Sequence, residues 1–254
     1  MKILLLFIII ILNTNVIYSR SIGETEITAE DGIEVFQDEK YYLLKKNVKI
    51  ESDNFILFGD IVKISFENDL YDIQIINADG NVDLVSAIYK IKANGDRLKF
   101  TVKNEEIQVE GEGSKLITHD TKMFSDGIIT VNNINGKFNL SGFNSSLETS
   151  DITIKGEQIK GMFTTKSDNK EILILDVYDE NIAYINNNEA EMFANNIKYK
   201  KETSIIELEN NVKIISEGET ITGDYGTLDT QSNSYKIKSN DKKKVRVIIS
   251  NSDE

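Results

Sequence analysis

The residues of this 254-residue chain that could carry out catalysis are few. His119 is the single histidine and there is no cysteine, so a Ser–His–Asp triad would have to use His119, and no motif surrounds any serine. A zinc site draws on several His or Cys ligands, which this chain cannot supply. The 42 acidic residues include no pair marked for glycoside hydrolysis. We therefore predict no catalytic residue, no metal site and no cofactor, and interpret His119 as an exposed residue at a strand end.

Two recurrent dipeptides could bind a ligand, namely Gly59-Asp60 and Gly223-Asp224. Their recurrence favours a structural role, in which Gly permits a turn or bulge and Asp caps it before the next strand. The stretch Asp79-Gly80-Asn81 indicates a tight turn, because the alternating oxygen ligands of a calcium loop do not follow it. Structural turns are thus the favoured interpretation of all three.

A duplicated unit must position these turns. Residues 47–73 align without a gap with residues 211–237 at a constant offset of 164, with 9 identities over 27 positions. Asn81–Leu84, followed by Gly95–Leu98, forms a weaker third copy. Such repetition indicates that one strand–turn–strand unit has been used more than once.

Apolar and polar residues alternate along the chain in short runs that end in Asn, Asp, Gly or Ser, which is typical of strands and turns. There is no proline to interrupt a hydrogen-bond ladder. The pattern predicts an all-β sandwich, barrel or roll. The least patterned stretch, 133–150, marks a soft boundary between one module at 24–132 and another at 145–250. One continuous roll and two consecutive modules both remain open.

The formal net charge of −13 argues against nucleic acid as a partner, since phosphate binding needs a basic surface.

Residues 1–19 predict a cleaved signal peptide, because Lys2 precedes the apolar run Ile3–Leu12 and Ser19 is a small residue for cleavage. The run is about half the ~20 apolar residues that span a membrane. We expect an exported protein of the periplasm, with an uncleaved anchor as the alternative.

The order of these motifs resembles the OstA-like family of periplasmic lipopolysaccharide-transport proteins, which includes the bridge protein LptA. The repeated unit of that family combines an Asn-Val-x-apolar strand, a turn, and a strand that contains Gly-Asp. The resemblance is carried by Asn47–Ile50, Leu57–Asp60, Gly80–Leu84, Asn211–Ile214, Ile221–Asp224 and Val245–Val247. The chain departs from the family at Lys46 and Asn210, where the unit usually has Gly, and in being longer than a single module.

The resemblance implies an open β-jellyroll of stacked antiparallel strands. It implies a non-enzymatic carrier that shields the acyl chains of lipid A in an apolar groove and assembles end to end by strand addition. The implied partners are lipopolysaccharide, an LptC-like inner-membrane protein, an LptD-like outer-membrane translocon and further copies of the chain. Alternation places these residues in the groove: Val48, Ile50, Val62, Ile64, Phe66, Ile73, Ile75, Val82, Leu84, Leu98, Phe100, Val212, Ile214, Ile221 and Leu228.

Other interpretations remain open from the sequence. The inward aliphatic residues are equally typical of an ordinary sandwich core. A protein that keeps residues 1–19 would be an inner-membrane-anchored, LptC-like partner of the same fold. Outside this class, a polysaccharide-active enzyme or a structural envelope protein could be built on a repetitive β-scaffold.

Overall fold

The computed structural model describes residues 20–68, 72–88, 90–118, 120–165, 170–240 and 244–249. Over these residues the chain forms a 20-stranded antiparallel sheet with one short 3-10 turn, η1 (Val102–Asn104). The all-β fold of stacked antiparallel strands is therefore confirmed. The strands are β1 (Glu26–Thr28), β2 (Ile33–Phe36), β3 (Tyr41–Glu51), β4 (Ile56–Phe66), β5 (Ile73–Ser86), β6 (Ile91–Thr101), β7 (Glu106–Glu110), β8 (Ser114–Ile117), β9 (Lys122–Ser125), β10 (Ile128–Asn132), β11 (Lys137–Ser141), β12 (Ser146–Glu148), β13 (Thr153–Lys155), β14 (Gln158–Phe163), β15 (Ile172–Asn186), β16 (Glu191–Lys200), β17 (Ile205–Ser216), β18 (Glu219–Asp229), β19 (Ser234–Lys238) and β20 (Arg246–Ile249).

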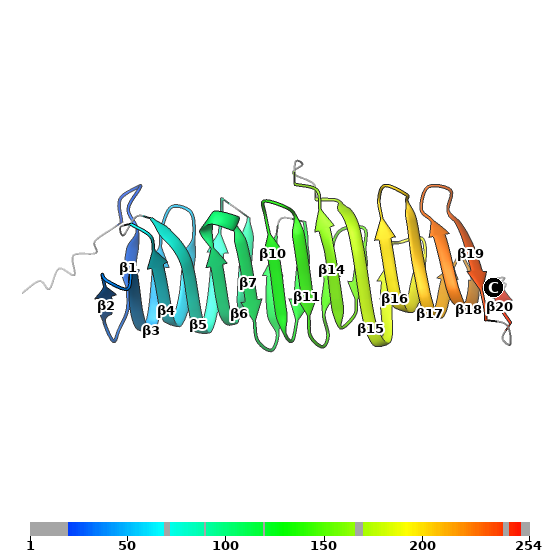
Figure 1. Ribbon diagram of the computed structural model, residues 1–254, viewed down its shortest axis with the longest axis horizontal. Helices are drawn as coiled ribbons and strands as arrows, with labels where there is room; N and C mark the ends of the chain where they lie inside the picture. The colour runs from blue at the N-terminus through cyan, green and yellow to red at the C-terminus, as the bar shows by residue number, and fades with distance from the viewer. Residues whose placement is uncertain are drawn as a thin grey trace, which may run out of the picture.

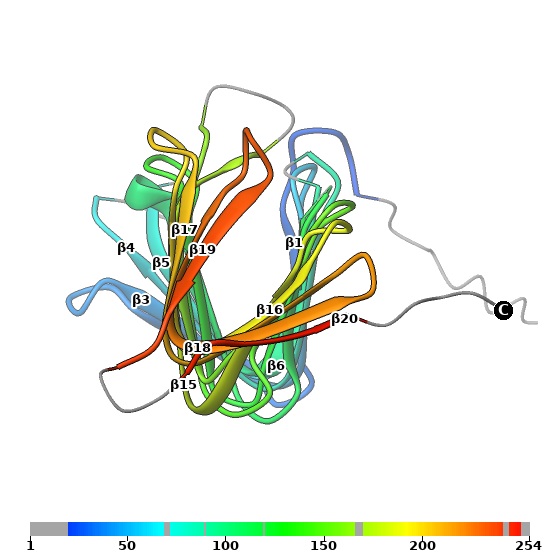
Figure 2. The same ribbon diagram turned by 90° about the vertical axis from the view of Figure 1, so that its right-hand side faces the viewer.

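The strands stack along one long axis, with the N-terminal strands at one end and the C-terminal strands at the other (Figure 1). Seen along this axis, two walls meet at a corner and diverge towards an open side, which we call the mouth (Figure 2). The first wall contains β2, β7, β10, β11, β14 and β19, and the second contains β1, β8, β9, β12, β13 and β20. The long strands β3 to β6 and β15 to β18 contribute one half to each wall.

The long strands bend at the corner where one strand of a pair carries extra residues. The register of β3 with β4 shifts between Lys45 and Val48, and the intervening Lys46 and Asn47 have φ angles of 65° and 48°. A bulge of this kind bends its strand and increases the local twist. The same left-handed pairs recur at Gly80-Asn81 in β5 and at Asn210-Asn211 in β17.

Asp60 links neighbouring strands at the corner. Its Oδ2 accepts a hydrogen bond of 2.8 Å from Nδ2 of Asn81. A Cβ atom on Gly80 would lie 2.9 Å from the Cβ of Asp60, which is closer than real Cβ contacts allow. Gly80 therefore supplies both the positive φ of 76° and the space that the aspartate needs. The Gly-Asp units thus act at the corner of the fold.

The duplicated unit occupies equivalent places at the two ends of the roll. Val48 pairs with Gly59 between β3 and β4, and Val212 pairs with Gly223 between β17 and β18. Val212 follows Val48 by 164 residues, and Gly223 follows Gly59 by the same 164 residues, which is the offset of the sequence repeat. The sequence repeat therefore corresponds to a repeated strand pairing, and the bend at the corner is repeated with it.

The left-handed positions explain why Lys46 is unusual, and they give a stability prediction. Replacing Lys46 with Gly should raise the free energy of unfolding by about 0.5–1 kcal/mol, because a non-Gly residue at positive φ is strained. Lys49 lies on the same strand but is not among the positive-φ residues. Replacing Lys49 with Gly should therefore lower the free energy of unfolding by about 0.5–1 kcal/mol. Urea unfolding followed by circular dichroism measures both. Equal losses for the two variants would contradict the strain at Lys46.

The sheet continues through the stretch 133–150, where the sequence suggested a boundary. In the first wall β11 pairs with β10 and β14, and in the second wall β12 pairs with β9 and β13. Hydrogen bonding therefore links the ranges 24–132 and 145–250 on both walls. Whether each range folds as a module by itself stays a prediction, which the stability of separately produced halves would test.

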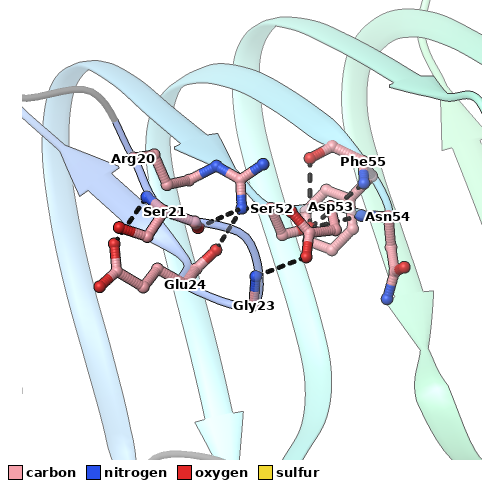
Figure 3. Close-up of polar contacts among 8 residues, drawn as sticks. All are labelled: Arg20, Ser21, Gly23, Glu24, Ser52, Asp53, Asn54 and Phe55. Atoms are coloured by element: carbon pink, nitrogen blue, oxygen red, sulfur yellow. Dashed lines mark hydrogen bonds and ion pairs between the residues drawn. The ribbon is translucent and has the colours of Figure 1, made fainter.

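The segment Arg20–Glu24 is fastened to the turn between β3 and β4 (Figure 3). The Arg20 guanidinium lies 2.6 Å from Oδ1 of Asp53, and the Gly23 N–H donates a 2.7 Å hydrogen bond to Oδ2 of the same carboxylate. These contacts lower the pKa of Asp53 from its ordinary value of 3.8, the Arg20 hydrogen bond first and the Gly23 N–H second. The segment is thus held by a charge-assisted clamp at the N-terminal end of the roll.

Acid should release this clamp. The pKa of Asp53 is lower in the folded protein than its ordinary value of 3.8. The ionised carboxylate therefore stabilises the fold fully above pH 3.8, and this stabilisation is lost as the pH falls through the pKa of the folded state. Hydrogen exchange at the Gly23 amide should therefore accelerate in that window beyond its intrinsic pH dependence. In an Asp53→Asn variant the amide should exchange fast already at neutral pH. Unchanged protection in that variant would contradict the clamp.

Candidate functional site

The inner faces of the two walls form one apolar interior. Alternate residues of each strand point into it, since successive side chains of a strand lie on opposite faces. Most residues predicted to line a groove lie in this interior and are at most 8% exposed. These are Val48, Ile50, Val62, Ile64, Phe66, Val82, Leu98, Val212, Ile214, Ile221 and Leu228. Ile73, Leu84 and Phe100 are half-buried and pack against the same interior.

Ile75 does not share this face, and the sequence alternation was misleading there. Phe66 pairs with Ile73 whereas Ser65 pairs with Ile75, so Gln74 is an extra residue in β5. A slip of one residue moves every following side chain to the opposite face of a strand. Ile76, which is 4% exposed, therefore takes the interior position and Ile75 lies on the outer face.

An apolar pocket opens from the interior to the mouth in the N-terminal half. Its volume is about 40 Å³, far below the ~300–1,000 Å³ of sites that hold drug-sized ligands. The pocket is lined by Phe55, Leu57, Ile76, Leu84, Ser86, Ile91, Leu98, Phe100, Glu105, Ile107 and Asn133. Leu84, Leu98 and Phe100 were predicted from alternation. Phe55 was not, because it lies in a turn, where alternation carries no information.

A second pocket opens at the mouth in the C-terminal half, with a volume of about 360 Å³. The floor of this pocket is apolar and includes Ile152, Ile172 and Tyr199. Its polar residues include Lys170 and Lys201. Lys201 is paired with Glu171. None of the residues predicted for this half lines the pocket, namely Val212, Ile214, Ile221 and Leu228.

A third pocket of about 210 Å³ lies between these two along the mouth. It shares Glu105 and Asn133 with the N-terminal pocket and Lys170 with the C-terminal pocket. Here the interior is tightly filled, because the rings of Phe138 and Phe163 lie 4.3 Å apart and both side chains are at most 3% exposed. The three pockets therefore adjoin along the mouth, with an aromatic pair at the middle.

The ends of the roll expose apolar strands. In β2, Ile33 and Val35 are 46% and 47% exposed, and in β20, Val247 and Ile249 are 51% and 67% exposed. In the described residues β2 pairs only with β3, and β20 only with β18. Each strand thus presents an unpaired backbone edge, which is a template for pairing with a further strand.

No catalytic constellation or metal site emerges from the described residues. They contain no group of three or more His, Cys, Asp or Glu side chains that could hold a metal ion. His119 lies outside the described residues. Within the same described ranges, no helix has the length and apolar character needed to cross a membrane.

Comparison with known proteins identifies a distant similarity in fold. No family model matches the chain. No curated protein matches it by sequence. Among solved structures it is similar to the crystal structure of LptH, the LptA-homologous periplasmic component of the conserved lipopolysaccharide transport device from Pseudomonas aeruginosa. The identity is 15% and the TM-score 0.40, over 51% of this chain and 94% of that chain. A similarity this low decides neither family nor function.

Proposed function

We propose that this chain is a non-enzymatic carrier of lipopolysaccharide, which holds the acyl chains of lipid A between its two walls. The observation that supports this most directly is the apolar interior that opens at the mouth beside Phe55 and Phe100. The resemblance of the repeated units to OstA-like proteins points to the same ligand class.

The energetics of this interior suit an acyl chain. Burying a methylene group stabilises a complex by about 0.8 kcal/mol, so a chain of lipid can be shielded from water without any chemistry. The free space in the N-terminal pocket is small, and the walls pack on one another elsewhere. Lipid entry would therefore replace contacts between the walls, which must move apart about the corner.

The proposal places the protein in the periplasm, as a bridge between an LptC-like inner-membrane protein and an LptD-like outer-membrane translocon. The unpaired edges of β2 and β20 support joining by strand addition, to these partners or to further copies of the chain. Replacing Val247 and Ile249 with Lys should reduce end-to-end oligomers seen by sedimentation, because charges on an edge strand oppose pairing. The same substitutions at the exposed turn residues Ile134 and Phe143 provide a control.

Photo-crosslinking tests the lipid site directly. A photoreactive residue at Phe55 or Phe100 should form an adduct with lipopolysaccharide, since both side chains line the N-terminal pocket. The same residue at Lys99, which is exposed on the outer face of β6, should not. Adducts at Lys99 with none at Phe55 or Phe100 would reject the interior as the lipid site.

The rival within this class is an anchored partner protein that keeps residues 1–19. Sequencing the N-terminus of the protein recovered from the cell envelope separates the two. A mature chain that begins near Arg20 supports the soluble bridge, whereas an intact Met1 supports the anchored, LptC-like protein.

A further inference from the structure

One hydrogen bond in the middle of the roll joins the two walls across the mouth. Asp120 lies in the turn between β8 and β9 of the second wall, and Lys170 lies two residues before the start of β15 in the first wall. The backbone N–H of Lys170 donates a 3.1 Å hydrogen bond to Oδ2 of Asp120. We call this contact the clasp. It connects residues 50 positions apart in the sequence.

Both partners of the clasp are held in place by their own walls. The hydroxyl groups of Thr118 and Thr121 lie 3.5 and 3.4 Å from Oδ1 of Asp120, which leaves Oδ2 for Lys170. On the first wall, Thr164 and Glu171 exchange hydrogen bonds, with the Thr164 N–H donating to the Glu171 carbonyl and the Glu171 N–H to the Thr164 hydroxyl. The Lys170 N–H is thereby positioned, because the next residue, Glu171, is held by its hydrogen bonds to Thr164.

The clasp lies where the pockets along the mouth meet. Lys170 lines both the middle pocket and the C-terminal pocket, and the middle pocket also contains Phe163 of the central aromatic pair. A second hydrogen bond across the mouth, from the Tyr235 hydroxyl to Oε2 of Glu219 at 2.9 Å, lies towards the C-terminal end of the roll. The C-terminal pocket is therefore bounded by a cross-wall contact on either side along the axis.

We infer that the clasp between Asp120 and Lys170 controls the passage of a lipid chain between the N-terminal and C-terminal pockets. This inference rests on the proposed function. With the clasp closed, the mouth is divided and an acyl chain occupies one half of the interior. When the clasp opens, the walls can separate over Phe163 and the two halves become one continuous groove.

The distance between the walls tests the clasp without any lipid. Because the chain has no cysteine, spin labels can be attached specifically at Ile134→Cys and Ser150→Cys, two exposed turn residues on opposite sides of the mouth. Asp120→Ala should broaden and lengthen the distance distribution between the labels. Glu189→Ala, at an exposed acidic residue of the turn between β15 and β16 in the second wall, should leave the distribution unchanged. A distribution in Asp120→Ala equal to that of the parent protein would overturn the inference.

Lipid passage is measured with purified lipopolysaccharide and a photoreactive residue at Thr165, which lines the middle pocket. The adduct yield at Thr165 should rise several-fold in Asp120→Ala and stay at the parent level in Glu189→Ala. In a variant that combines Asp120→Cys with Lys170→Cys, oxidation should lock the walls together and suppress this adduct, and a reductant should restore it.

The outcomes separate the two proposals. If adducts form at Phe55 and Phe100 but the yield at Thr165 ignores the state of the clasp, the lipid site stands and the control of passage is overturned. If no adduct forms at Phe55 or Phe100 in any variant, the proposed function fails, and the role of the clasp in lipid passage fails with it.

Discussion

Replacing Phe100 with Asp should weaken lipopolysaccharide binding at least about tenfold, equivalent to about 1.4 kcal/mol. Phe100 is half-buried and lines the N-terminal pocket together with Leu84 and Ile76. A carboxylate at this position would have to lose its hydration beside an acyl chain, and an unpaired buried charge is strongly unfavourable. The measurement is the affinity of the protein for lipopolysaccharide, determined at a detergent concentration below that at which the detergent forms micelles.

The neighbouring Thr101 supplies a matched control. Thr101→Asp makes the same change in net charge on the outer face of the same strand, since Thr101 pairs with the outward Ile75. It should leave the affinity near the parent value. A milder variant, Phe100→Ala, separates charge from lost packing and guards against a failure to fold. Parent-like binding by a folded Phe100→Asp protein would exclude the N-terminal pocket as the lipid site.

Replacing Leu140 with Ala should lower the free energy of unfolding by about 2–5 kcal/mol, the range for a buried Leu that leaves a cavity. Leu140 lies on β11 at the centre of the roll and pairs with Ile129 and Ile159, and all three side chains are 0% exposed. Because both walls pack on one another here, the cavity has little freedom to collapse. The chain contains no tryptophan, so far-UV circular dichroism in urea is the suitable measurement.

The control for Leu140 is Lys137→Ala, an exposed residue on the same strand, which should change stability by less than about 0.5 kcal/mol. A loss below about 1 kcal/mol for Leu140→Ala would mean that the central interior is loosely packed. In that case a lipid could displace the aromatic pair of Phe138 and Phe163 easily, and the clasp would matter less. The two measurements together therefore define how firmly the middle of the roll is closed.

Alternation in the sequence predicted which residues face the interior wherever the strands are regular. Val62 and Ile64 in β4, for example, are 0% and 2% exposed, because period-2 patterning follows directly from strand geometry. The offset of 164 between the duplicated units likewise reappears as equivalent pairing at the two ends of the roll. Local physics decides these features, so the sequence alone suffices for them.

Alternation was misleading at Ile75, where the extra residue Gln74 reverses the faces of β5. It also missed Phe55, because turn residues have no period. In the C-terminal half it selected interior residues that do not reach the pocket. The pattern within one strand shows which face of the sheet a side chain lies on, but it does not show which pocket that side chain reaches.

The all-β roll, its inward faces and its repeated corner were determined by the sequence itself, since each depends on neighbours along one strand or on the strand beside it. The pockets along the mouth and the clasp between Asp120 and Lys170 were decided only by the tertiary structure. They depend on how two walls with no sequence register between them approach one another. An Asp in a turn and a backbone N–H 50 residues away carry no mutual signal until the corner brings their walls face to face.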